Sequence, residues 1–325
     1  MRINIRKSTF LFTLLQTALL AGVSGAQELS FFTGKMEEKS GKGSYAWQIE
    51  YNQAFSEHFA WSFSWLNEGH VPDHHRDGPV LQVWMRNAVF DGKLALSAGI
   101  GPYKYFDTEA ARRGKSFDDV HGWGVETSLS ATWYMGRRWF LQVRENHGRI
   151  SGDIDTDMLL LGIGYQLQAP DKRGPVSGPE EQQERSTNNE ITAFAGQTVI
   201  NSYNSQTADA FAFEYRRGLA KYLDLTVGWL NEGNTDIARR GGITAQLWPV
   251  RTFFDNRLAL SAGFGAYFAV DSRRKEETNF TSGVLSMSAS YRFLQHLLVR
   301  ASWNRVMTNY NRDTDVMMAG LGVRF

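Results

Sequence analysis

Three aspartates at alternate positions form the first group whose types and spacing could do chemistry. Asp153, Asp155 and Asp157 could bind calcium, or bridge phosphate groups through divalent cations, because hard cations prefer carboxylate oxygens. The alternative is a solvated loop in which Asp157 only begins a strand, and turns commonly contain aspartate. The sequence favours the loop, so no metal ligand is assigned and the three aspartates stay a hypothesis.

Histidines are concentrated in the first half of the chain, and residues 70–77 contain three of them together with two aspartates. Imidazole and carboxylate groups together suit zinc or another transition metal. Adjacent His74 and His75 need not face one ion, however, and solvated loop histidines are the alternative that we favour.

The overall composition excludes several classes of function. The 325 residues include no cysteine, which excludes disulfides, a thiolate nucleophile and cysteine-bound zinc. A net charge of +1 gives no reason to expect a nucleic acid partner. A mean hydropathy of −0.37 excludes a polytopic helical membrane protein, although 13% of the residues are aromatic. No pattern in the sequence indicates a cofactor, so we expect none.

Residues 1–26 have the three regions of a secretory signal peptide. Positive charges at Arg2, Arg6 and Lys7 precede a short apolar run at 10–23, and small residues follow at 24–26. This run is too short to span a bilayer comfortably, which takes about 20 residues. The sequence therefore predicts that residues 27–325 are exported, with a buried N-terminal helix as the alternative.

The exported chain consists of one unit written twice. The sequence Trp-Leu-Asn-Glu-Gly occurs at 65–69 and 229–233, and Leu-Ala-Leu-Ser-Ala-Gly occurs at 94–99 and 258–263, at the same offset. A polar segment rich in Pro, Glu, Gln and Gly separates the two copies. The predicted domains are 27–168 and 190–325, joined by a polar linker at 169–189.

Within each unit, apolar and polar residues alternate. Trp47, Ile49 and Tyr51 alternate with Gln48 and Glu50, and similar runs of about 8–12 residues recur eight times in each half. The connections between runs alternate between short turns and long polar segments. The long segments of the first half are 36–43, 69–78, 107–121 and 149–156. Short turns at one end and longer loops at the other are typical of outer-membrane barrels.

Each half therefore resembles the small eight-stranded outer-membrane barrels, the group of OmpA-type, OmpX-type and lipid A deacylase-like proteins. The terminal Phe325 looks like the assembly signal of such proteins. The resemblance implies an all-β fold, a transmembrane antiparallel up-and-down barrel in the outer membrane of a Gram-negative bacterium. It also implies lipid and lipopolysaccharide as surroundings, and the barrel-assembly machinery as a partner during biogenesis.

Sixteen strands could close as two barrels or as one porin-like barrel. The interior of an eight-stranded barrel is just filled by side chains, and bulky Trp84 pointing inward suits such a filled core. Inward polar residues are expected to pair, and the candidates are Glu50 with Arg86 or Arg144, and Glu214 with Arg300. The sequence favours two barrels, with one sixteen-stranded barrel as the alternative.

The resemblance to lipid A deacylases implies a histidine and a serine two residues apart on an outer strand, acting with an acidic residue. Here Ser151 follows His147 by four residues, and the second half has Trp303 in place of the histidine. The family triad does not carry over, so His147 and Ser151 with Glu145 or Glu68 stay speculative.

The predicted function is an integral outer-membrane barrel with a structural or surface-interaction role and no open pore. A lipid A-modifying acyl hydrolase and a sixteen-stranded diffusion porin are the alternatives.

Overall fold

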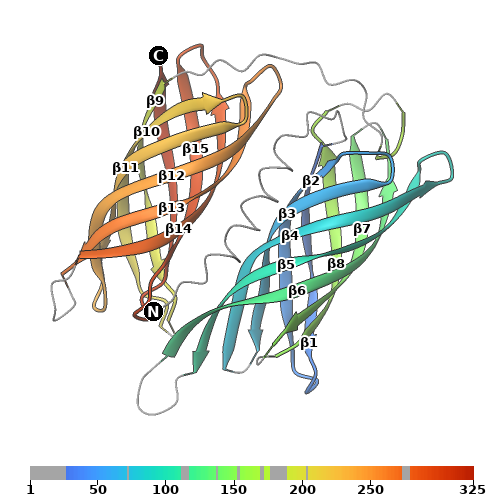
Figure 1. Ribbon diagram of the computed structural model, residues 1–325, viewed down its shortest axis with the longest axis horizontal. Helices are drawn as coiled ribbons and strands as arrows, with labels where there is room; N and C mark the ends of the chain where they lie inside the picture. The colour runs from blue at the N-terminus through green and yellow to red at the C-terminus, as the bar shows by residue number, and fades with distance from the viewer. Residues whose placement is uncertain are drawn as a thin grey trace. The chain divides into compact units, whose positions relative to one another are not determined.

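The computed structural model describes residues 27–71, 73–110, 117–136, 138–151, 154–168, 172–175, 189–202, 204–272 and 279–325. Within them the chain forms sixteen antiparallel strands arranged as two closed barrels of eight (Figure 1). The signal peptide expected at 1–26 lies outside the described residues. The described residues include no helix that is long and apolar enough to cross a membrane.

The first barrel contains β1 (Gln27–Glu38), β2 (Gly43–Ala54), β3 (Phe59–Val71), β4 (His74–Val89), β5 (Leu94–Ala110), β6 (Phe117–Tyr134), β7 (Trp139–Ile150) and β8 (Thr156–Gln166). The second barrel contains β9 (Asn189–Ile200), β10 (Thr207–Ala220), β11 (Leu223–Asn234), β12 (Arg239–Phe253), β13 (Leu258–Asp271), β14 (Asn279–Arg292), β15 (Leu297–Met307) and β16 (Thr314–Arg324). Successive strands are neighbours, so both barrels have up-and-down order.

Each barrel closes by pairing its first strand with its last. In the first barrel β1 pairs with both β2 and β8, and Phe31 lies opposite Ile163 in the closing ladder. In the second barrel β9 pairs with both β10 and β16, and Ala195 lies opposite Ala319. The prediction of two eight-stranded barrels is confirmed, and the alternative of one sixteen-stranded barrel is wrong.

Side chains alternate between the outside and the inside of each barrel, as the period-two pattern predicts. On β7, Leu141 and Val143 are 46% and 47% exposed, whereas the next residue, Arg144, is 1% exposed. The other outward rows are equally apolar and include Met85, Leu96, Ile100, Leu159 and Leu161 in the first barrel and Phe211, Phe213, Ile243, Phe268 and Leu321 in the second. Such rows are unfavourable in water and match the lipid-facing band of a transmembrane barrel.

Segment 69–78, which the sequence predicts to be a long loop, is mostly strand. β3 continues to Val71 and β4 begins at His74, with a register shift between Asn67 and His70. Gly69 has a φ of 66°, and its N–H donates a 2.9 Å hydrogen bond to the Asn67 side chain. The polar segment forms a strand because this bulge keeps its backbone in the hairpin ladder. Polarity alone does not distinguish a loop from a strand that extends beyond the lipid.

An inward tryptophan packs against a glycine of the neighbouring strand in each barrel. A Cβ on Gly99 would lie 2.6 Å from the Trp84 ring, and a Cβ on Gly263 would lie 2.6 Å from the Trp248 ring. The Trp84 indole N–H donates a 2.8 Å hydrogen bond to Ser62, and a threonine accepts the same bond in the second barrel. The glycine that ends the repeated Leu-Ala-Leu-Ser-Ala-Gly motif therefore makes room for the ring.

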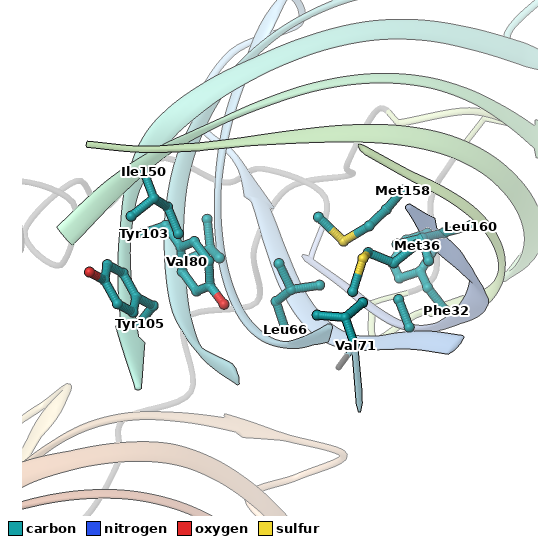
Figure 2. Close-up of a cluster of buried hydrophobic side chains, with 11 residues drawn as sticks. Phe32, Met36, Leu66, Val71, Val80, Tyr103, Tyr105, Ile150, Met158 and Leu160 are labelled. Atoms are coloured by element: carbon teal, nitrogen blue, oxygen red, sulfur yellow. The ribbon is translucent and has the colours of Figure 1, made fainter. Parts of the chain in front are cut away.

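The interior of the first barrel also contains an apolar cluster, which the polar inward pattern does not predict. Figure 2 shows its members, among them Phe32, Met36, Leu66, Val80, Tyr103, Met158 and Leu160. Leu66, Tyr103 and Leu160 are fully buried although they lie on three different strands. The second barrel has its own cluster, which includes Phe194, Leu230, Tyr267, Val284 and Val306. Both barrels are thus filled by side chains of both polarities.

We expect Gly99→Val to destabilise the first barrel by about 1–3 kcal/mol, because the added side chain must displace the Trp84 ring from a packed interior. Urea unfolding of the full chain in detergent, followed by tryptophan fluorescence, measures the effect. Gly136→Val is the matched control, since a Cβ at Gly136 meets no atom within 4 Å. Equal losses in the two variants would contradict this account of Gly99.

Candidate functional site

A buried ion pair crosses the middle of the first barrel. The Arg144 guanidinium on β7 donates hydrogen bonds of 2.7 and 2.6 Å to the two carboxylate oxygens of Glu50 on β2. Its charged carbon lies 4.2 Å from the Phe32 ring centre and 4.7 Å from the Trp84 ring centre. The two-point contact and the flanking rings together hold the guanidinium in one orientation.

The second barrel contains the corresponding pair. Arg300 donates to Glu214 at 2.8 Å and to Glu190 at 2.5 Å, and a third bond of 2.7 Å goes to Ser290. Arg216, which stands beside Glu214, lies over the ring of Trp248 at 4.4 Å. Each barrel therefore places a guanidinium among carboxylates and against an inward tryptophan.

Arg86, the other candidate partner of Glu50, binds backbone carbonyls instead. It donates to the Ser56 oxygen at 3.4 Å and to the Pro175 oxygen at 2.8 Å, at the short-turn end of the first barrel. Gly174 beside it accepts a 2.9 Å bond from the Gln166 side chain. Residues 174 and 175 fall within the segment expected to be a polar linker, yet both are buried. This short stretch packs against the turn end of the barrel.

A second ion pair closes the loop end, and sequence reasoning missed it. Arg76 on β4 binds Glu68 on β3 and also donates to the Ile154 carbonyl at 2.9 Å. The Thr156 hydroxyl on β8 donates to Glu68 at 2.9 Å. The network therefore ties β3 and β4 to β8 across the barrel.

The same network recurs in the second barrel. Arg240 donates to Glu232 at 2.9 and 2.6 Å and to the Arg312 carbonyl at 2.7 Å, and Thr314 donates to Glu232 at 2.5 Å. Its signal was present in the repeat, since both glutamates belong to the Trp-Leu-Asn-Glu-Gly motif and both arginines follow at the same spacing.

Little free space is left between the two ion pairs and the turn end of the first barrel. A cavity of about 20 Å³ lies there, bordered by Glu28, Glu50, Arg86 and Tyr134 among others. Such a volume holds about one water molecule. Between the described residues of the first barrel, this cavity is a pocket for ordered water and is too small for solute passage.

Two of the speculative catalytic residues, Glu145 and His147, face outward on β7. His147 Nδ1 is bonded to Asp157 on β8, and Nε2 accepts a 3.0 Å bond from Arg149. Ser151 is an exposed turn residue, and no hydrogen bond joins it to His147 in the described part of the chain. The other acid considered, Glu68, is inside the barrel with Arg76. The structure thus holds an imidazole against a carboxylate but does not bring a hydroxyl to it, and the hydrolase stays a prediction.

The speculative aspartate ligands have separate partners. Asp153 lies outside the described residues. Asp155 accepts a 2.5 Å bond from Lys39 and a 3.1 Å bond from the Ile150 N–H, and the Lys39 bond lowers the pKa of Asp155 below its usual value. Asp157 is bonded to His147 instead. Because Asp313 accepts the corresponding backbone bond in the second barrel, at 2.7 Å, this aspartate closes a loop in both units.

We expect Arg144→Met to destabilise the first barrel by about 3–5 kcal/mol, because it leaves the Glu50 carboxylate buried without its partner. The double variant Glu50→Gln/Arg144→Met removes both charges and should recover much of the loss. Urea unfolding in detergent measures both. Lys39→Met, at an exposed pair, is the control and should change little. A double variant as unstable as the single one would contradict the pairing argument.

Comparisons with known proteins concern the barrels alone. No protein-family model and no curated protein matches the chain. Among solved structures, the chain is similar to the N-terminal β-barrel domain of Pseudomonas aeruginosa OprF, with 10% identity and a TM-score of 0.35 over 43% of this chain and 98% of that one. Neisserial surface protein A matches at 8% identity and a TM-score of 0.36 over 44% and 97% of the two chains. The attachment invasion locus protein Ail of Yersinia pestis matches at 10% identity and 0.35, over 44% and 98%. Independently of these similarities, the strand pairing of this chain defines two eight-stranded transmembrane β-barrels in tandem.

Proposed function

We propose that this protein resides in the outer membrane of a Gram-negative bacterium and has a structural or surface-interaction role there. A cleaved signal peptide at 1–26 would deliver it. The observation that carries the proposal is the combination of apolar outward rows with a filled interior in a closed barrel. Lipid can surround such a barrel, while buried ion pairs occupy the space that a pore would need.

The expected partners follow from the same surfaces. The outward rows would contact outer-membrane lipid, and the polar strand ends beyond them would lie at the level of lipopolysaccharide headgroups. Phe325 is 61% exposed at the end of the last strand, where the barrel-assembly machinery would recognise it during biogenesis. No strongly basic surface is implied by the net charge of +1, which argues against a nucleic acid partner.

The two alternatives differ in their support. A porin needs a wide lumen, and the Glu50–Arg144 and Glu68–Arg76 pairs block the lumen of the first barrel. A lipid A hydrolase is favoured by one feature, the outward His147–Asp157 pair, because an imidazole held by a carboxylate can act as a base. It lacks a nucleophile in reach, so we place it behind the structural role.

Expression of the full chain in a Gram-negative host should yield a protein whose first residue is Gln27 and which sediments with the outer membrane. Unheated samples should migrate differently from boiled ones on a denaturing gel, because closed barrels resist detergent until heated. N-terminal sequencing and density-gradient fractionation provide the measurements. Recovery of the chain in the soluble periplasmic fraction would rule the proposal out.

Purified protein in planar lipid bilayers should give no large and steady single-channel conductance, because the described interior of the first barrel is filled. A variant that loses both loop-end partners, Glu68→Ala/Arg76→Ala, serves as a comparison for the effect of emptying part of the interior. Steady channels of porin size in the unmodified protein would show that the proposed role is wrong and would favour a diffusion pore.

A further inference from the structure

Three potential metal ligands meet at the loop end of the first barrel. His74 begins β4 and lies opposite Glu109 in the ladder with β5, and Asp107 precedes Glu109 by two residues on the same face. One ligand atom from each of the three lies within 4.8 Å of the other two. His74 Nδ1 is 2.8 Å from an Asp107 oxygen. We propose that His74, Asp107 and Glu109 bind a divalent transition-metal ion, with zinc as the representative case.

The donor set fits such an ion. One imidazole and two carboxylates are ligands that zinc accepts, and three protein ligands leave a fourth position for water or a bound molecule. Ligand atoms on a tetrahedral zinc lie about 3.3 Å apart, given bond lengths near 2.0 Å. The observed separations bracket this value, so small side-chain rotations suffice to bind the ion.

Charge and positioning favour a cation at this place. The Asp107 side chain is fully buried, and its second oxygen accepts a 3.1 Å bond from the His75 N–H, which orients the carboxylate. Asp107 and Glu109 bring two negative charges to His74. The neighbouring Arg76 is itself bonded to the Glu68 carboxylate, so the described carboxylates in this region outnumber its guanidinium.

The second barrel provides an internal comparison. Asp271 corresponds to Asp107, and it accepts the same backbone bond, from Arg239 at 3.1 Å. The residue that corresponds to His74 is Ala238, and the sequence has an arginine, at position 273, where the first barrel has Glu109. The aspartate therefore has a structural role in both units, whereas the two additional ligands occur only in the first. This difference is what a metal site specific to the first barrel requires.

A competing pair of histidines lies nearby. The rings of His70 and His75 are 4.0 Å apart, and these residues face each other across the β3–β4 ladder. Because neighbouring strand residues point to opposite faces, His75 lies on the other side of β4 from His74. Any test must therefore separate the two pairs.

The test is a zinc titration of the full chain, refolded in detergent and stripped with a chelator, by isothermal titration calorimetry at neutral pH. We expect saturable binding of one zinc ion per chain. His74→Ala, which introduces the second barrel's residue, and Glu109→Gln should each weaken binding at least about tenfold. The control variant His70→Ala/His75→Ala should bind zinc as the unmodified protein does. Heat-modifiable migration on a gel verifies that each variant has folded.

Several outcomes would overturn the proposal. These are the absence of saturable zinc binding at millimolar concentration, unchanged affinity in the folded Glu109→Gln variant, or loss of binding only in His70→Ala/His75→Ala. Calcium provides the last discrimination, since it prefers oxygen ligands. Calcium binding as tight as zinc binding, and unaffected by His74→Ala, would indicate a purely acidic site and not the one proposed. If His74→Ala fails to fold, Glu109→Gln alone decides the question.

Discussion

The structure depends on one constraint, the closure of each sheet after eight strands. Lipid offers no hydrogen bonds, so the edges of β1 and β8 must pair with each other, as must those of β9 and β16. A barrel of eight strands is narrow, and its inward side chains meet across the interior. The filled core, the fixed tryptophans and the paired charges all follow from this small circumference.

Charges inside such a barrel cannot be left unpartnered, because burying an unpaired charge is costly. Both barrels meet this requirement in two layers, one near mid-barrel and one at the loop end. Glu68 and Arg76 recur as Glu232 and Arg240 with nearly the same set of hydrogen bonds. Duplication has kept the loop-end network as a unit, whereas the mid-barrel pair has gained additional partners around Arg300.

Period-two alternation was enough to predict the strands and the two closed barrels, because a lipid-facing row and an inward row differ in polarity at every step. The pairing of Glu50 was narrowed to two arginines but could not be decided, since Arg86 and Arg144 both point inward and only the stagger of the strands determines which one meets it. The bulge at Gly69 and the inward apolar cluster could not be predicted, because each depends on register between strands. The grouping of His74 with Glu109 depends on register in the same way.

The buried stretch at Gly174 and Pro175 has a consequence for the order of assembly. These residues follow β8 in the chain, yet the Pro175 carbonyl binds Arg86 inside the turn end of the first barrel. The first barrel thus obtains one of its stabilising contacts from chain that is delivered after its last strand. A chain cut immediately after β8 would close its sheet but leave that guanidinium with fewer acceptors, so the unit of folding extends past the unit of repetition.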